Sequence, residues 1–368
     1  MNKKTQPCTH CGAVHPRVNL TWMGSAELCP ECLQRYTVCC DCCGERIWMA
    51  NDYGTHYLHL CASCRADNYV TCENCGALIP QEDAHYNDED EAYCDSCYER
   101  GYGGTIHNYS YKPEPIFYGD GPLYLGVELE VDEAGKDNIN AVQALRAFNQ
   151  ENVYGYVKSD GSLNDGFELV THPCTLETHL QQVPWRETLE ALRGMGYRSH
   201  APGTCGLHVH VSRKALGKDV YEQEETIAKL LYIFERFWQE ILRFSRRTES
   251  QINHWAARYG YKDRGEEILK EAKHGANGRY ACINLTNTDT IEFRVFRGTL
   301  KYNTVIATLQ FVANLCRVAI SLPEYRIQEF SWPALIEALT QDNCPELVQY
   351  LKERNLYVNE PVTAEREV

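Results

Sequence analysis

The stretch LYLGVELEVD, residues 123 to 132, places two carboxylates on one face of a strand-like pattern. Because successive side chains of a strand point to opposite faces, its leucines and valines share one face and Glu128 and Glu130 share the other. Two carboxylates this close repel each other, and each raises the pKa of the other, unless a cation lies between them. The pair therefore indicates either the wet face of a half-exposed strand or a site for a divalent cation.

Three further segments repeat this design. In CGLHVHVS, residues 205 to 212, His208 and His210 lie opposite the apolar side chains. In TIEFRVFRG, residues 290 to 298, Glu292 and Arg294 do the same, and in GFELVTHP Glu168 stands between two apolar residues. A single histidine on a strand is more often a structural residue than a ligand. Four such strands together, however, supply the residues of a divalent-metal site that faces an open cavity.

The first hundred residues contain a threefold repeat with a period of 32 residues. Each repeat opens with C-x2-C-G and carries a second C-x2-C after a gap of 17, 17 and 18 residues. These gaps fall in the range of four-thiolate zinc sites. The predicted zinc ligands are Cys8, Cys11, Cys29, Cys32, Cys40, Cys43, Cys61, Cys64, Cys72, Cys75, Cys94 and Cys97.

Metal is expected to be structural in these repeats. A unit of this length cannot bury enough apolar surface to fold alone, and a structural zinc ion supplies about 10–16 kcal/mol. Four ligands close the coordination shell, so the predicted three Zn2+ ions are not catalytic. The layout resembles treble-clef or LIM-like modules, in which the second cysteine pair opens a short helix. Cys39 and Cys42 leave the register of the middle module open, and an iron–sulfur cluster is the minor alternative.

The composition and the motifs that are absent narrow the classes of partner and location that we expect for this chain. The net charge of -15 argues against nucleic acid or an anionic membrane as the main partner. The most apolar segment, from Thr304, carries Asn314 and Arg317 and is expected to be a buried amphipathic helix rather than a membrane span. No signal peptide is recognisable at the start, so a cytoplasmic location is expected.

The H-E-x-x-H motif, the P-loop and the Rossmann glycine fingerprint are absent, so any ATP would be bound without a P-loop.

Beyond residue 121 the patterns of strands and helices alternate irregularly. Strands are predicted at 123–132, 154–159, 166–172, 205–212, 279–286 and 290–297, and helices at about 137–149, 186–194, 220–245 and 304–321. Residues 101–121 are rich in Gly, Tyr and Pro without a clear period and are expected to form a linker. The expected domains are zinc modules at 1–38, 39–70 and 71–100, the linker at 101–121, and a larger domain at 122–368.

Six motifs, in this order, resemble the amidoligase family, which is related to the glutamine synthetase and glutamate–cysteine ligase fold of carboxylate–amine ligases. They are GVELE, KSDGS, ELVTHP, GLHVHVS, RYACIN and EFR. The resemblance runs from about Gly126 to Arg297 and extends through the following helices to about residue 350, without the zinc repeats. It implies an α+β fold: a glutamine synthetase-like catalytic domain with a curved, mainly antiparallel sheet and packed helices, preceded by the three zinc modules.

The resemblance also implies roles for the site residues. Glu128, Glu130, Glu168, His208 and Glu292 would hold Mg2+ or Mn2+ ions. The residues expected to contact ATP are Arg294, Arg279, His210 and Asn284. Lys158 would contact phosphate, and Asp160 would deprotonate the incoming amine. The number of catalytic metals stays open, because further acidic ligands of glutamine synthetase have no counterpart in this sequence.

That chemistry accounts for the acidic strands. Joining a carboxylate to an amine in water is uphill, so the carboxylate is first converted to an acyl phosphate by ATP. Phosphoryl transfer gathers anionic oxygens, and the task of the protein is to position them and neutralise their charge with metal ions and arginine. The leading hypothesis is an ATP-dependent ligase that forms an amide or isopeptide bond on a peptide or protein substrate recruited by the zinc modules, with a small amine or amino acid as a further possibility.

Two other classes remain open on the sequence. In one, the zinc modules serve an interaction or adaptor protein whose ligase-like part is an inactive scaffold, and failure to bind ATP with Mg2+ would favour it. In the other, the same histidines and glutamates serve a metal-dependent hydrolase. Hydrolysis in the absence of nucleotide would identify that class.

Overall fold

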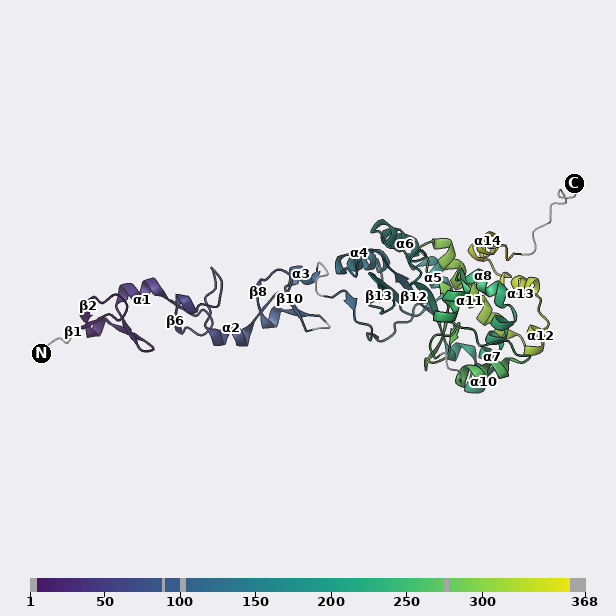
Figure 1. The fold of residues 1–368 in the computed structure, drawn as a ribbon, viewed down its shortest axis with the longest axis horizontal. Helices are drawn as coiled ribbons and strands as arrows, with labels where there is room; N and C mark the ends of the chain where they lie inside the picture. The colour runs from purple at the N-terminus through teal and green to yellow at the C-terminus, as the bar shows by residue number, and fades with distance from the viewer. Residues whose placement is uncertain (1–4, 88–89, 100–103, 275–277, 358–368) are drawn as a thin grey trace. The chain divides into compact units, whose positions relative to one another are not determined.

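The computed structural model describes residues 5–87, 90–99, 104–274 and 278–357 and divides the chain into two compact units, Met1–Gly104 and Thr105–Val368 (Figure 1). The expected linker residues 101–103 and the end of the expected domain at 368 lie outside the described residues. The combination of three cysteine clusters with a large sheet and many helices confirms the expected α+β fold preceded by three small modules.

Short hairpins and one helix make up each module of the first unit. The first module has β1 Thr5–Pro7, β2 Val14–Pro16, β3 Thr21–Met23, β4 Ala26–Leu28 and α1 Pro30–Tyr36. The second has β5 Thr37–Cys39, β6 Arg46–Trp48 and α2 Ala62–Asn68, and the third has β7 Tyr69–Thr71, β8 Leu78–Pro80, β9 His85–Tyr86, β10 Ala92–Tyr93 and α3 Asp95–Glu99. Because β5 and β7 follow α1 and α2 directly, these modules begin at Thr37 and Tyr69, just before the boundaries expected after residues 38 and 70.

A tight turn builds the first half of each cysteine cluster. In the first module the N–H of Gly12 donates to the carbonyl of Cys8 at 2.9 Å, and Gly12 has a φ of 73°. Gly44 and Gly76 have the same bond at 2.8 Å and φ values of 75° and 70°. This left-handed backbone conformation favours glycine, which is why C-x2-C-G recurs in the sequence.

The beginning of a helix forms the second half of each cysteine cluster. Cys29 and Cys61 are the N-cap residues of α1 and α2, and Cys32 and Cys64 lie one turn into those helices. The four sulfurs of each module come together as expected, with Sγ–Sγ distances of 3.8 Å for Cys11–Cys29, Cys43–Cys61 and Cys75–Cys94. Tetrahedral zinc with bonds of about 2.3 Å separates its sulfurs by about 3.8 Å, so the clusters fit zinc.

Backbone donors favour a thiolate at the first cysteine of each cluster, whereas burial and the neighbouring sulfurs raise the pKa of other members, Cys32 to about 12. The N–H groups of Cys61 and Cys43 lower the pKa of the Cys40 thiol to about 6. Burial raises the pKa of Cys8 and Cys72, but backbone N–H donors outweigh it and bring both to about 6. Thiolates are the form that binds metal. The middle register is also settled, because the cluster contains Cys40 and Cys43 while Cys39 and Cys42 lie outside it.

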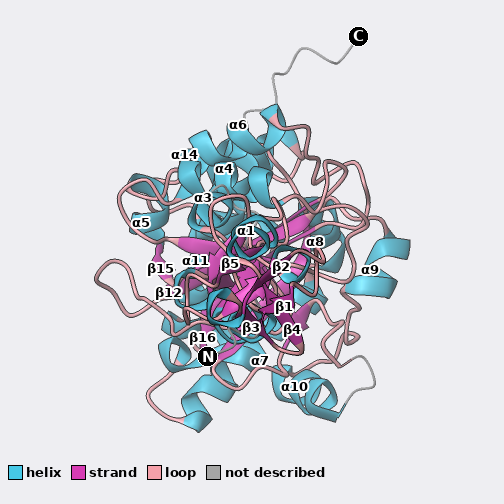
Figure 2. Cartoon of the chain, turned by 90° about the vertical axis from the view of Figure 1, so that its left-hand side faces the viewer, coloured by secondary structure: helices cyan, strands magenta, loops and turns pink. Residues whose placement is uncertain are grey.

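An eight-stranded sheet forms the centre of the second unit, where helices surround it (Figure 2). Its strands are β11 Ile106–His107, β12 Tyr124–Val131, β13 Gly155–Lys158, β14 Phe167–Thr171, β15 Cys174–Thr175, β16 Gly206–Ser212, β17 Ile283–Asn284 and β18 Thr290–Arg297. The order is β11-β13-β14-β12-β16-β18-β17, with β15 paired to β12 beside β14. All pairings are antiparallel except β11 with β13.

The helices of the second unit pack around this sheet. They are α4 Asn138–Phe148, α5 Leu176–Gln181, α6 Trp185–Gly194, α7 Val220–Arg236, α8 Trp238–Ser245, α9 Glu249–Trp255, α10 Gly265–His274, α11 Tyr302–Ser321, α12 Glu324–Gln328, α13 Trp332–Leu339 and α14 Pro345–Glu353. The pattern predicted one helix over 220–245, but Phe237 leaves the helical conformation and divides it into α7 and α8. Helix α11 is long and apolar enough to span a membrane by length and composition alone, but most of it is buried in the core, as the sequence predicted.

One face of the sheet makes the core. Leu125, Val127, Leu129 and Val131 of β12 are fully buried, as the alternation predicted. Phe293 of β18 packs against Phe234 of α7 with ring centroids 5.7 Å apart. Apolar burial on this face fixes the register of each strand, because a slip by one residue would turn every apolar side chain to the opposite face.

Residues 105–118 differ from the expected linker. Ile106 and His107 pair with Val157 and Lys158 of β13, and Tyr118 bridges to Cys174. These contacts make the segment part of the second unit. Sequence patterns could not predict these contacts, because the segment has no hydrophobic period and its partners lie far along the chain.

The cysteine register yields a test with a matched control. Cys64→Ser removes a ligand of the middle cluster, whereas Cys42→Ser removes a neighbouring cysteine outside it. We expect Cys64→Ser protein to contain two zinc ions per chain and Cys42→Ser protein three, because loss of one thiolate opens a closed structural site. Elemental analysis of the purified chains measures this. Three zinc ions in the Cys64→Ser chain would contradict the assignment.

Candidate active site

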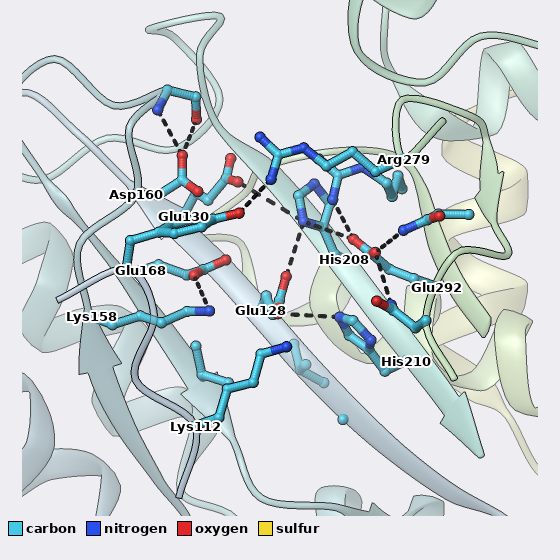
Figure 3. A pocket seen from close by; sticks show the side chains of 18 of the residues that line it. Lys112, Glu128, Glu130, Lys158, Asp160, Glu168, His208, His210, Arg279 and Glu292 are labelled. Atoms are coloured by element: carbon cyan, nitrogen blue, oxygen red, sulfur yellow. Dashed lines mark hydrogen bonds and ion pairs between the residues drawn. The ribbon is translucent and has the colours of Figure 1, made fainter. Parts of the chain in front are cut away.

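The polar face of the sheet lines an open cavity of about 1540 Å3 (Figure 3). Its walls come from β12, β14, β16 and β18, from the loop after β13, and from the segment that contains Tyr109 and Lys112. All five residues that the sequence assigned to metal line it: Glu128, Glu130, Glu168, His208 and Glu292. The residues assigned to ATP or catalysis line it as well: Lys158, Asp160, His210, Arg279, Asn284 and Arg294.

The antiparallel register brings these residues together. On one side of β12, Glu130 is opposite Glu168, and Glu168 is opposite Lys158. On the other side, Glu128 is opposite His208, His210 is opposite Glu292, and Glu292 is opposite Asn284. Residues directly opposite each other in an antiparallel pair share a face, so the pairing alone gathers the site from six strands.

His208 lies at the centre of the carboxylates. Its Nδ1 is 3.4 Å from Glu128, 3.5 Å from Glu292 and 3.9 Å from Glu130. The side chain is almost fully buried, and no single carboxylate holds it at close hydrogen-bonding distance. Such a spread of oxygen and nitrogen donors around one point is suited to a cation.

His210 occupies a second cluster with Glu128 and Glu292. Its Nε2 lies 3.2 Å from Oε1 of Glu128, yet this buried atom has no hydrogen bond of suitable geometry among the described residues. Two sets, Glu128–His210–Glu292 and Glu128–Glu168–His208, have ligand atoms within 4.8 Å of one another. The site therefore fits two neighbouring metal ions that share Glu128. The sequence assigned His210 to phosphate, and the structure places it in the first of these sets.

Outer contacts orient the carboxylates. Glu292 accepts hydrogen bonds from Asn284 at 2.8 Å and from Nη1 of Arg294. Glu130 accepts a hydrogen bond from the backbone N–H of Gly206, and Glu168 lies 3.3 Å from Nζ of Lys158. Partners of this kind fix the rotamers of metal ligands and tune their affinity.

The carboxylates are electrostatically unequal. Burial raises the pKa of Glu128, but the charges of His210 and His208 outweigh it and hold that pKa well below its usual value. Burial and repulsion from Glu128 raise the pKa of Glu168 well above its usual value, although Lys158 opposes the shift. Without a cation, the cluster therefore keeps a proton on some members. A divalent cation would let all of them ionise.

Positive side chains surround the carboxylates. Arg294 has a buried Nε without a hydrogen-bond partner among the described residues. Arg279 lies at the exposed rim, where its Nη2 donates to the hydroxyl of Tyr280 at 2.9 Å and its Nη1 donates to Tyr109. The cavity thus offers cations to an anionic ligand beside its carboxylates.

Three cations of the cavity escaped the sequence analysis: Lys112, Lys136 and Arg247. Lys112 lies in the segment expected to be a linker, and no local pattern marks it as a site residue. Arg247 follows a residue in the left-handed conformation after α8, and this turn directs it into the cavity. Burial lowers the pKa of Arg247 to about 10, and Glu130 partly opposes the shift.

The loop after β13 presents Asp160. One oxygen of Asp160 accepts hydrogen bonds from the N–H of Ser162 at 2.7 Å and from its hydroxyl at 2.5 Å. The KSDGS motif therefore forms a tight turn, as its Asp-Gly pair suggests, and the turn also lines the cavity. Asp160 thus lies at the wall of the cavity, on the same side as Glu130 and Glu168 (Figure 3).

A comparison with known protein families agrees with the sequence motifs. Residues 146–316 match a family model described as "Putative amidoligase enzyme". Among solved structures, a bifunctional glutathione synthetase from Pasteurella multocida is similar over 63% of this chain and 46% of its own, at 15% identity and a TM-score of 0.32. This chain thus spans about half the length of that protein.

A second solved structure is the complex between the prokaryotic ubiquitin-like protein Pup and its ligase PafA. It is similar over 63% of this chain and 62% of its own, at 10% identity and a TM-score of 0.30. No curated protein matches the sequence.

The geometry predicts that Glu128 is needed for divalent-metal binding. Glu128→Gln should weaken Mn2+ binding at the sheet by at least about tenfold, because even outer partners of metal ligands contribute this much. Electron paramagnetic resonance of free Mn2+ measures the affinity. Glu133→Gln, which removes an exposed carboxylate just beyond the end of β12, is the matched control and should bind normally. Equal affinity in wild type and Glu128→Gln would refute the assignment.

Proposed function

We propose, from the amidoligase match of residues 146–316, that the chain is an ATP-dependent ligase that joins a carboxylate to an amine through an acyl phosphate. The observation that carries the proposal is the row of carboxylates and histidines across four antiparallel strands, with cations beside it in one cavity. Acyl-phosphate formation requires metal-binding carboxylates and cationic side chains in one site, because the reaction brings several anionic oxygens together.

Glu128, Glu130, Glu168, His208 and Glu292 would hold Mg2+ or Mn2+, and His210 joins them in this proposal because it shares a cluster with Glu128. When bound, such ions neutralise phosphate oxygens and orient them for in-line transfer. The side chains themselves do the positioning. Asn284 and Lys158 hold the outer oxygens of Glu292 and Glu168, which keeps the inner oxygens directed toward the centre of the site.

The cations would receive the phosphates of ATP. Arg294 is placed beside Glu292 and would clamp the transferred phosphoryl group with its planar guanidinium. Lys158 lies beside the carboxylates, and Arg279 at the rim would contact phosphate oxygens farther out. Asn284, which donates to Glu292 at 2.8 Å, would also contact a phosphate oxygen, whereas His210 is assigned here to metal in place of the phosphate contact that the sequence predicted.

Asp160 would deprotonate the incoming ammonium group. Its turn leaves the carboxylate at the edge of the cavity, on the side of β13, where a bulky amine could approach from solvent. Removal of that proton creates the nucleophile that attacks the acyl phosphate, and the amide bond forms as phosphate leaves.

The substrate in this proposal is a peptide or protein, with a small amine or amino acid as the other possible acceptor. The three zinc modules would recruit it, since their closed sites have no catalytic position. The setting is reducing and cytoplasmic, because the thiolate clusters require free cysteines and all 19 cysteines are unpaired. Nucleic acid and membrane partners are not part of the proposal.

The first test measures ADP release from ATP with Mg2+ while a mixture of amino acids and hydroxylamine is supplied. We expect nucleotide turnover and a hydroxamate, which would trap the acyl phosphate and identify the acid. Glu128→Ala should abolish the signal, and Arg294→Gln should lower kcat by roughly 10²–10³-fold, as the loss of one transition-state donor does. Glu133→Gln is again the control.

Other outcomes distinguish the remaining classes. Hydrolysis of amide or phosphoester bonds without nucleotide would replace the ligase by a metal-dependent hydrolase. If neither nucleotide turnover nor ATP binding is observed in the presence of Mg2+, the remaining class is an adaptor protein whose ligase-like part is an inactive scaffold.

The role of Asp160 has its own test in the same assay. Asp160→Asn should slow the reaction of an alkylamine, which is protonated at neutral pH, far more than that of hydroxylamine, which is not. General-base catalysis typically contributes about 10²–10⁴-fold, so the two acceptors should separate clearly. Equal rates of wild type and Asp160→Asn with the alkylamine would remove Asp160 from this role.

A further inference from the structure

A second cavity, of about 520 Å3, lies apart from the carboxylate site and shares none of its lining residues. Its wall combines the end of α6, the beginning of α11, the end of α14 and the residue that follows α8. Helices α6 and α14 both lie in the upper part of Figure 2. The proposed ligase reaction uses no residue of this cavity.

The cavity is positively charged in a chain whose net charge is -15. Four cations line it, Arg193, Arg246, Lys301 and Arg354, against the single carboxylate of Glu353. Glu353 lies 2.8 Å from Nζ of Lys301. Among the described residues, none of the three arginines forms an ion pair with a carboxylate. Arg354 donates to the carbonyl of Arg243 at 3.1 and 2.9 Å, which leaves its charge without a neutralising carboxylate. Like charges gathered without carboxylate partners favour an anionic ligand.

Arg246 is held in place by its surroundings. Its Nη1 donates to the carbonyl of Gly298 at 3.1 Å, its Nη2 donates to Arg297, and its buried Nε has no partner among the described residues. Its φ of 65° is a left-handed conformation in which helix ends usually carry glycine. The two carbonyl contacts fix the guanidinium of Arg246 at the wall of the cavity.

The beginning of α11 brings the positive end of a helix dipole to the cavity. The helix is 20 residues long, its N-cap is Lys301, and no side chain caps it. Leu300, Lys301 and Thr304 of this end line the cavity. The N–H groups of Lys301 and Thr304 are already bonded, to Thr299 and to the carbonyl of Lys301, so the contribution of this end to an anion is the field of the helix dipole.

We propose that this second cavity binds the phosphate group of a small molecule. An arginine fork can bind two oxygens of a phosphate group at once, and the dipole of α11 adds positive polarity beside the arginines. The volume suits a ligand of small-molecule size, since such cavities measure about 300–1,000 Å3. The inference goes beyond the ligase reaction and stands or falls separately from it.

Arg246 lines this cavity and its neighbour Arg247 lines the carboxylate site, so the test must separate the two sites. The probe is inorganic phosphate, titrated into the full chain by calorimetry at constant ionic strength, without nucleotide or added divalent metal. The test variant is Arg193→Gln/Lys301→Gln, which changes two exposed residues of the cavity. The matched control, Lys270→Gln/Arg326→Gln, removes the same charge from exposed positions on α10 and α12. Arg294→Gln reports on the carboxylate site.

We expect saturable binding to wild type, to the control and to Arg294→Gln. The Arg193→Gln/Lys301→Gln chain should bind at least about tenfold more weakly, because it loses two cations and leaves Glu353 unpaired at the cavity. Loss of binding in Arg294→Gln with unchanged binding in the cavity variant would overturn the proposal. No saturable binding to wild type would overturn it as well. Neither result depends on ATP turnover.

Discussion

Repulsion among carboxylates is the constraint on which the second unit depends. Glu130 and Glu168 face each other across β12 and β14, and Glu128 lies between the two histidines of β16. Burying such groups without compensation is strongly unfavourable, because both desolvation and mutual repulsion oppose their ionised forms. The fold sustains this arrangement with Lys158, Arg294 and the histidines, and our account holds that divalent cations complete the compensation.

The rest of the unit supplies the rigidity that this arrangement requires. The apolar side chains of β12, β16 and β18 are buried against α7, α8 and α11, which fixes the register of each strand. Since a register shift would turn every polar residue to the other face, the core determines the site indirectly. The three cysteine modules have a different problem, the shortage of apolar core in a short chain, and their clusters fit zinc ions whose bonds would compensate for it.

The sequence predicted the parts of this protein that depend on local spacing. Alternation placed Glu128 and His208 on polar faces, and cysteine spacing located the zinc ligands. The sequence could not show the order of the strands in the sheet, because β12 pairs with β14 and β16, which lie in distant parts of the chain. For the same reason it missed the role of residues 105–118 and the position of Arg247, which depends on the left-handed turn at Arg246. The break at Phe237 was also hidden, since the apolar stripe continues across it.

The most direct test of the central claim is a crystal structure of the full chain with Mn2+ and a non-hydrolysable ATP analogue, using anomalous scattering to locate the metal. The account predicts manganese peaks within coordination distance of Glu128 and its neighbouring histidines, with the analogue's phosphates between the metal and Arg294. A nucleotide bound elsewhere, or a carboxylate cluster without manganese beside a bound nucleotide, would contradict it.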